Sequence, residues 1–137
     1  MQEFSAEEVD VKLLPNGKAI LLTDFSYENE KIKVTAKAGF EFDGASIPKF
    51  FWRAVGHPFS FKLLRPAVIH DICYATECFE REYSDDLFEE MLDFAGVSEL
   101  VENSMYYAVR IGGDDVWEEH TEKSIMDALK FIEIKEK

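Results

Sequence analysis

The chain has 137 residues, of which 47% are hydrophobic and 14% aromatic, and its formal net charge is −13. This length suits one ordinary domain with a packed core, and the composition excludes an intrinsically disordered chain. The 28 acidic residues against 15 basic ones predict a surface that repels phosphate backbones, so nucleic acid is not expected as a ligand. Such a surface is suited to solubility, to cation binding or to a basic protein partner.

Residues 1–38 are predicted to form an antiparallel sheet of about three strands. Val9, Val11 and Leu13 alternate with polar residues, and Pro15-Asn16-Gly17 is a hairpin signal before a buried run at 19–23. The polar residues 27–30 read as the tip of the next turn. The alternating stretch 31–36 is then expected to pair back on the run at 19–23.

Residues 39–48 contain too many Gly and Pro breaks for a regular element and are predicted to form an ordered loop. Residues 49–137 have a helical period. We therefore expect an α+β fold in one domain, residues 1–137, with the sheet packed against four or five helices. Their predicted spans are 49–55, 66–79, 84–96, 98–111 and 122–134.

Three residue types, Pro, Ser and Gly, set the predicted ends of these helices. Pro66 suits a first helical turn, where its missing N–H is not needed. Ser84 and Ser98 are predicted N-caps, and Gly96 and the pair Gly112-Gly113 are predicted stops.

The segment around His70 places ionisable groups among apolar residues. His70 and Tyr74 are four residues apart and share one helix face, whereas Asp71 is turned by about 100°. Because a buried polar group is costly without a partner, His70 is expected to have one elsewhere in the fold.

Asp85, on the following antiparallel helix, is the carboxylate expected to point inward. A hydrogen bond to His70 requires a bend or a late start of that helix, because the predicted helix ends leave the two residues two to three turns apart. If the contact forms, the imidazole is held in one tautomer and can act as a general base. Arg110, on a helix that otherwise faces inward, is a candidate buried partner for a carboxylate and a candidate substrate-binding residue.

A hard cation such as calcium prefers oxygen ligands, and Asp71 together with the loop residue Asp43 could supply them. Ser46 adds a hydroxyl on the same loop, as a candidate substrate-binding residue. Each residue also has a plain structural interpretation. His70 can be a hydrogen-bonded core histidine, Asp71 a partner of a nearby arginine, and Asp85 a helix-capping carboxylate.

The chain contains four motifs in succession: GF-x-x-DGASIP from Gly39, P-A-x-x-HD-x-x-Y from Pro66, R-x-x-x-D-x-x-F from Arg81, and Y-x-A-V-R-x-x-G-x-x-x-W ending at Trp117. Together they resemble a family of small uncharacterised proteins from bacteriophages and bacterial genomes, known only as a domain of unknown function. The resemblance covers nearly the whole chain and implies a phage or prophage origin, without naming a reaction.

His-Asp-x-x-Tyr on a helix, followed by an Asp on the antiparallel helix, is also similar to the active site of phospholipase A2 enzymes. In that family the His is the base, the next Asp binds calcium, and the distant Asp and the Tyr orient the His. The similarity implies these roles for His70, Asp71, Asp85 and Tyr74. The glycine-rich calcium loop and the disulfides of the family's secreted members are absent here.

Cys73 and Cys78 are expected to point away from each other on one helix and to remain reduced thiols. The N-terminus has no signal-peptide pattern, and no window is apolar enough to cross a membrane, so we expect a cytoplasmic or virion-associated protein.

Two functions remain open. The first is a calcium-assisted hydrolase of a small ester or lipid. The second is a non-catalytic phage accessory, assembly or host-factor-binding protein, in which the motif residues are structural and the partner is an unknown protein.

Overall fold

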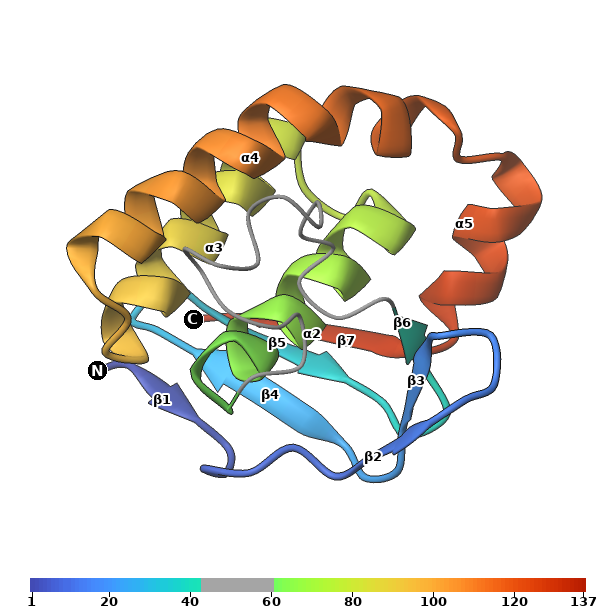
Figure 1. The fold of residues 1–137 in the computed structure, drawn as a ribbon. Helices are drawn as coiled ribbons and strands as arrows, with labels where there is room; N and C mark the ends of the chain where they lie inside the picture. The colour runs from blue at the N-terminus through green and yellow to red at the C-terminus, as the bar shows by residue number, and fades with distance from the viewer. Residues whose placement is uncertain (43–60) are drawn as a thin grey trace.

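The computed structural model describes residues 1–42 and 61–137, which form two antiparallel sheets and four helices (Figure 1). This confirms the α+β class, with mostly N-terminal strands packed against helices. One sheet has the order β1 (Glu3–Phe4), β4 (Phe25–Glu28), β5 (Ile32–Ala36), β7 (Ile132–Glu136), and the other β2 (Val11–Leu13), β3 (Ala19–Leu21), β6 (Glu41–Phe42). The helices are α2 (Phe61–Thr76), α3 (Arg81–Phe94), α4 (Glu99–Glu118) and α5 (Glu122–Leu129).

The predicted hairpin at Pro15-Asn16-Gly17 is confirmed, because it joins β2 to β3 and Gly17 has a positive φ of 85°. The expected pairing of residues 31–36 with 19–23 is wrong. β5 pairs instead with β4 and β7, while β3 pairs with β2 and β6. The reason is that the predicted polar tip begins inside β4, where Tyr27 is fully buried, and the chain turns only at Asn29, whose Oδ1 accepts the N–H groups of Lys31 and Ile32.

The last helix is shorter than predicted. It ends at Leu129, and the chain then forms β7, in which Ile132 and Ile134 lie opposite Ala36 and Val34 of β5. The alternation Ile-Glu-Ile-Lys-Glu fits a strand with one face on the core, so strand pairing prevails over the helical period. β7 therefore falls in the region predicted to be helical, and β6 falls in the region predicted to be a loop.

Three predicted helix ends are also wrong. α2 begins at Phe61, so Pro66 lies inside it and removes one backbone hydrogen bond. α3 begins at Arg81, and Ser84 is a buried helical residue rather than the N-cap. α4 continues through Gly112-Gly113 to Glu118. The Ser98 cap is confirmed, with Ser98 Oγ accepting the N–H of Val101 at 3.3 Å, whereas the helix predicted at 49–55 lies outside the described residues.

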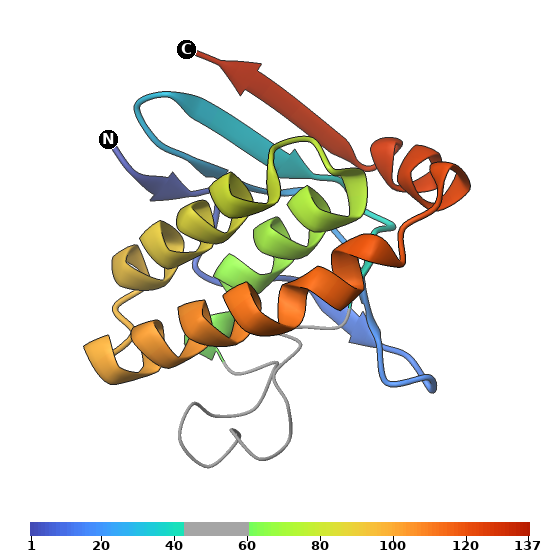
Figure 2. The same ribbon diagram turned by 90° about the horizontal axis from the view of Figure 1, so that it is seen from above.

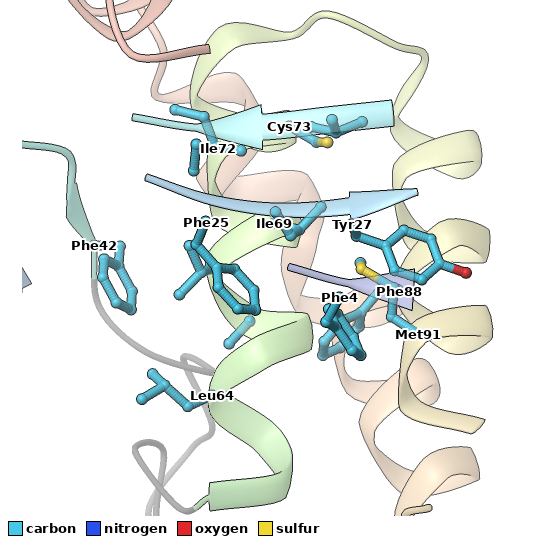
Figure 3. Packing of buried hydrophobic residues seen from close by; sticks show 14 of the residues in the cluster. Phe4, Phe25, Tyr27, Phe42, Leu64, Ile69, Ile72, Cys73, Phe88 and Met91 are labelled. Carbon is cyan, nitrogen blue, oxygen red and sulfur yellow. The ribbon is translucent and has the colours of Figure 1, made fainter. Parts of the chain in front are cut away.

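The helices lie on one side of the four-stranded sheet, and both chain ends lie at the same end of that sheet (Figures 1 and 2). Figure 3 shows the core between them, with aromatic residues of the strands facing apolar residues of α2 and α3. Burying each large apolar side chain contributes about 1.5–3 kcal/mol, so this layer holds α2 and α3 against the sheet. The labelled residues at its centre include Phe4, Phe25, Tyr27, Ile69, Ile72, Phe88 and Met91.

The connection between α2 and α3 brings His70 and Asp85 to the same height. His70 lies six residues before the end of α2, and Asp85 lies four residues after the start of α3. At 1.5 Å per residue these positions are about 9 Å and about 6 Å from the connection. The late start of the second helix that the contact was expected to require is therefore wrong. α3 begins earlier than predicted and α2 ends earlier, and together these shifts remove the separation of two to three turns.

Candidate functional site

Asp85 is the centre of a polar cluster that joins three helices. Its side chain is fully buried. His70 of α2 lies with Nε2 2.8 Å from Asp85 Oδ1, and the Tyr74 hydroxyl donates to the same oxygen at 2.7 Å. Arg110 of α4 donates from Nη1 to Asp85 Oδ2 at 2.7 Å. The structure thus brings together four of the predicted site residues.

The charge state of the cluster follows from these bonds. Burial by itself would raise the pKa of Asp85, but the hydrogen bonds from His70, Tyr74 and Arg110 lower it below its usual range. Burial and the bond to Asp85 raise the pKa of Tyr74 well above its usual value, and the bond to Asp85 also raises the pKa of Arg110. At neutral pH the cluster therefore holds an ionised carboxylate, a protonated phenol and a guanidinium.

The ionised carboxylate fixes the tautomer of His70. A carboxylate only accepts hydrogen bonds, so the proton of a neutral His70 must be on Nε2, and Nδ1 carries the lone pair. The ring is stacked on Phe88 at a centroid distance of 4.4 Å and is tilted against Tyr74, also at 4.4 Å. Its orientation is therefore set by packing as well as by the hydrogen bond. The His70 side chain is 9% exposed.

Arg81 supports the cluster from the start of α3. Its Nη2 donates to the backbone carbonyls of Val109 and Arg110, and its Nη1 lies 2.8 Å from Asp114. These contacts hold α3 against the part of α4 that carries Arg110. The sequence prediction treated Arg81 as a motif residue and as one possible partner of Asp71, not as a contact between α3 and α4. The signal for its position was the four-residue spacing from Arg81 to Asp85, which places both on neighbouring turns of α3.

Gly113 and Trp117 of α4 enclose Tyr74. A Cβ atom on Gly113 would lie 2.5 Å from the Tyr74 hydroxyl oxygen and 3.1 Å from Arg81 Nη2. Trp117 meets the Tyr74 ring edge-on at 5.1 Å. Gly113 therefore lets α4 approach Tyr74 closely. This explains why a glycine that was predicted to end the helix lies inside it.

The predicted cation ligands are not assembled by the described residues. Asp71 is half-buried on α2, and the hydrogen bonds that join the cluster at Asp85 come from His70, Tyr74 and Arg110. Within residues 1–42 and 61–137 no three His, Cys, Asp or Glu side chains form a group that could hold a metal ion. Asp43 and Ser46 lie outside the described residues.

Comparison with known proteins identifies the family. The family model "Protein of unknown function (DUF1353)" matches residues 19–109, two thirds of the chain, and includes His70, Tyr74 and Asp85. The chain belongs to the DUF1353 family. Arg110 is the first residue after the matched range.

The chain is also similar to the uncharacterised protein y4jT of Sinorhizobium fredii, with 33% identity over 96 residues. That alignment covers 69% of this chain and 29% of the relative, so the chain spans less than a third of the relative's length. No solved structure matches this DUF1353 protein. None of the helices formed by residues 61–137 is both long and apolar enough to cross a membrane.

Proposed function

We propose that the DUF1353 protein is an ester hydrolase and that His70 is its general base. The observation that carries the proposal is the fully buried Asp85, which binds His70 through Nε2 and leaves Nδ1 as the proton acceptor. The arrangement of His70, Tyr74 and Asp85 also matches the roles that the phospholipase A2 similarity implies. A positioned base of this kind contributes about 10²–10⁴-fold to a rate.

In the proposed step, Nδ1 of His70 takes a proton from a water molecule as the water oxygen attacks the ester carbonyl carbon. The imidazole then carries a positive charge, which the adjacent Asp85 carboxylate stabilises through the bond to Nε2. When the tetrahedral intermediate collapses, the ester C–O bond breaks and Nδ1 returns the proton to the leaving oxygen, so that a carboxylic acid and an alcohol are released and His70 is neutral again. Tyr74 and Arg110 keep Asp85 ionised and fixed, so that the ring does not turn when it is protonated. These three residues are positioning residues in this proposal.

Calcium binding through Asp71 is a separate part of the proposal. A bound calcium ion would supply Lewis-acid stabilisation of the carbonyl oxygen. The described residues do not fit such a site by themselves, since Asp71 is the one predicted ligand among them. The proton transfer above therefore uses no metal. Calorimetric titration with calcium on the wild type and on Asp71→Asn tests this part, and absence of heat in both would exclude it.

His70→Gln tests the base. The glutamine amide nitrogen can take the place of Nε2 and donate to Asp85, so the variant removes the base and retains the donor. His120→Gln is the matched control, because His120 is also enclosed and paired with a carboxylate, Glu77 at 3.0 Å, but on another part of the surface.

The assays are hydrolysis of p-nitrophenyl butyrate and of phosphatidylcholine vesicles. We expect activity in the wild type and in His120→Gln, and at least a 100-fold loss in His70→Gln with an unchanged unfolding midpoint. The hydrolase proposal is wrong if the wild type hydrolyses neither substrate, or if His70→Gln retains its activity.

The small exposed fraction of His70, 9%, favours a second candidate. In this alternative the cluster is structural, and the chain is a phage-type accessory or assembly protein that binds another protein, for which the net charge of −13 favours a basic partner. His70→Ala then unfolds the domain, and His70→Gln leaves every measured property of the wild type unchanged.

A further inference from the structure

We propose that Cys73 and Cys78 form an oxidation site, in which a hydroperoxide oxidises Cys78 and Cys73 converts the product into an intramolecular disulfide. The site lies at the C-terminal end of α2, outside the Asp85 cluster. It requires no contribution from the proposed hydrolase activity.

The backbone at the end of α2 brings the two cysteines together. Glu77 has a positive φ of 48°, and its N–H bonds to the carbonyl of Tyr74 at 3.1 Å. A left-handed residue directly after a helix reverses the chain, and in the Schellman arrangement the residue after it contacts the residue five positions earlier. Here those residues are Cys78 and Cys73. The expectation that the two thiols point apart on one helix is therefore wrong, because α2 ends at Thr76.

Side-chain contacts agree with this backbone. Cys78 Sγ lies 3.9 Å from the carbonyl oxygen of Cys73, so the side chain of Cys78 lies against the residue with which it would form the disulfide. Both cysteines are free thiols in the structure. Two cysteines that the backbone turn already places side by side need little backbone movement to form a disulfide.

The two thiols differ in a way that assigns their roles. Cys73 is fully buried, whereas Cys78 is partly exposed and can meet a small oxidant. The hydrogen bond from Cys73, together with bonds from Thr76 and from backbone N–H groups, lowers the pKa of Cys78 to about 7 against the opposing effect of burial. The bond to Cys78 and burial raise the pKa of Cys73. Cys78 is therefore the thiolate that reacts first.

The chemistry balances with a hydroperoxide as the oxidant. The Cys78 thiolate attacks one peroxide oxygen, the O–O bond breaks, and the other oxygen leaves as an alcohol or as water after taking up a proton. Cys78 is then a sulfenic acid. The Cys73 thiol loses its proton and attacks the Cys78 sulfur, the S–O bond breaks, and the hydroxyl group leaves with that proton as water.

The experiment uses the whole chain, which has no other cysteine, and needs no substrate. After treatment with hydrogen peroxide, mass spectrometry of the wild type is expected to show loss of two hydrogens, a peptide linking Cys73 to Cys78, and no alkylatable thiol. In Cys73→Ala the Cys78 sulfenic acid has no partner and is expected to react with dimedone.

Cys78→Ala is the matched control, because its remaining thiol is buried. It is expected to resist both peroxide and iodoacetamide in the folded state. Iodoacetamide at pH 7 is expected to alkylate Cys78 roughly fivefold or more faster in the wild type than in Cys73→Ala, since the thiol hydrogen bond is lost in the variant. The proposal is overturned if peroxide yields only disulfide-linked dimers or sulfinic acid in the wild type, or if Cys73→Ala leaves the alkylation rate unchanged.

Discussion

Replacing Gly113 by alanine tests the close approach of α4 to Tyr74. Alanine in place of a helical glycine stabilises by about 0.5–1 kcal/mol when the methyl group meets no obstacle. Gly112 provides this reference, because a Cβ atom there has no neighbour within 4 Å. Gly112→Ala is therefore expected to raise the unfolding free energy by about 0.5–1 kcal/mol.

At Gly113 the same methyl group lies 2.5 Å from the Tyr74 hydroxyl, so the tyrosine or α4 must move by nearly 1 Å to restore ordinary contact. That movement lengthens the bond of 2.7 Å between Tyr74 and Asp85. Since a hydrogen bond to a charged group contributes about 1.5–3 kcal/mol, Gly113→Ala is expected to destabilise the fold by about 1–2 kcal/mol after the gain in helix propensity is subtracted.

Urea unfolding and thermal melts of both variants measure the difference. A gap of about 1.5–3 kcal/mol between them corresponds to about 5–10 °C in the melting midpoint for a domain of this size. Adding Tyr74→Phe removes the hydroxyl that the methyl group meets, so the penalty of Gly113→Ala is expected to shrink by about 1 kcal/mol or more in that background. If the two alanine variants have the same stability, Gly113 does not set the distance between α4 and Tyr74.

Three further predictions concern stability. Tyr74→Phe alone is expected to cost about 2 kcal/mol in urea unfolding, since Asp85 loses one of its donors; a cost near zero would mean that this bond contributes nothing. Asp85→Asn is expected to cost about 3 kcal/mol at pH 7. Because the folded-state pKa of Asp85 is lowered, this difference from the wild type should be constant above the usual pKa of 3.8 and fall as the pH drops below it, and a difference that persists in acid would contradict the shift. Ser98→Ala, which removes the α4 cap, is expected to cost about 1 kcal/mol, with Ser104→Ala as the control outside the cap.

The sequence predicted the identity of the site better than its geometry. His70, Tyr74 and Asp85 could be chosen because ionisable residues at helical spacing in an apolar segment need partners. Their contact could not be derived, since it depends on where α3 begins. Ser84 has the local features of an N-cap, but the hydrogen bonds from Arg81 to α4 favour a helix that starts three residues earlier.

Tertiary contacts also explain the other differences. Gly112-Gly113 is a strong local stop signal, yet α4 continues because Gly113 has to face Tyr74. β7 could have been found from the alternation of Ile132 and Ile134, but five residues after an amphipathic helix are compatible with either element. Pairing with β5 decides between them, and that pairing joins residues about one hundred positions apart.

The residue types of the Asp85 cluster suit a chemical role better than a purely stabilising one. Replacing a buried ion pair by apolar side chains of similar size is often neutral or stabilising, so a core rarely needs one for its stability. Tyr74 donates to one oxygen of Asp85 and Arg110 to the other, so neither oxygen is left without a partner if His70 is removed. The hydrogen bonding of Asp85 therefore does not depend on His70. A titratable ring fixed by Phe88 and Asp85 in the tautomer that leaves Nδ1 unprotonated is the arrangement that a general base requires.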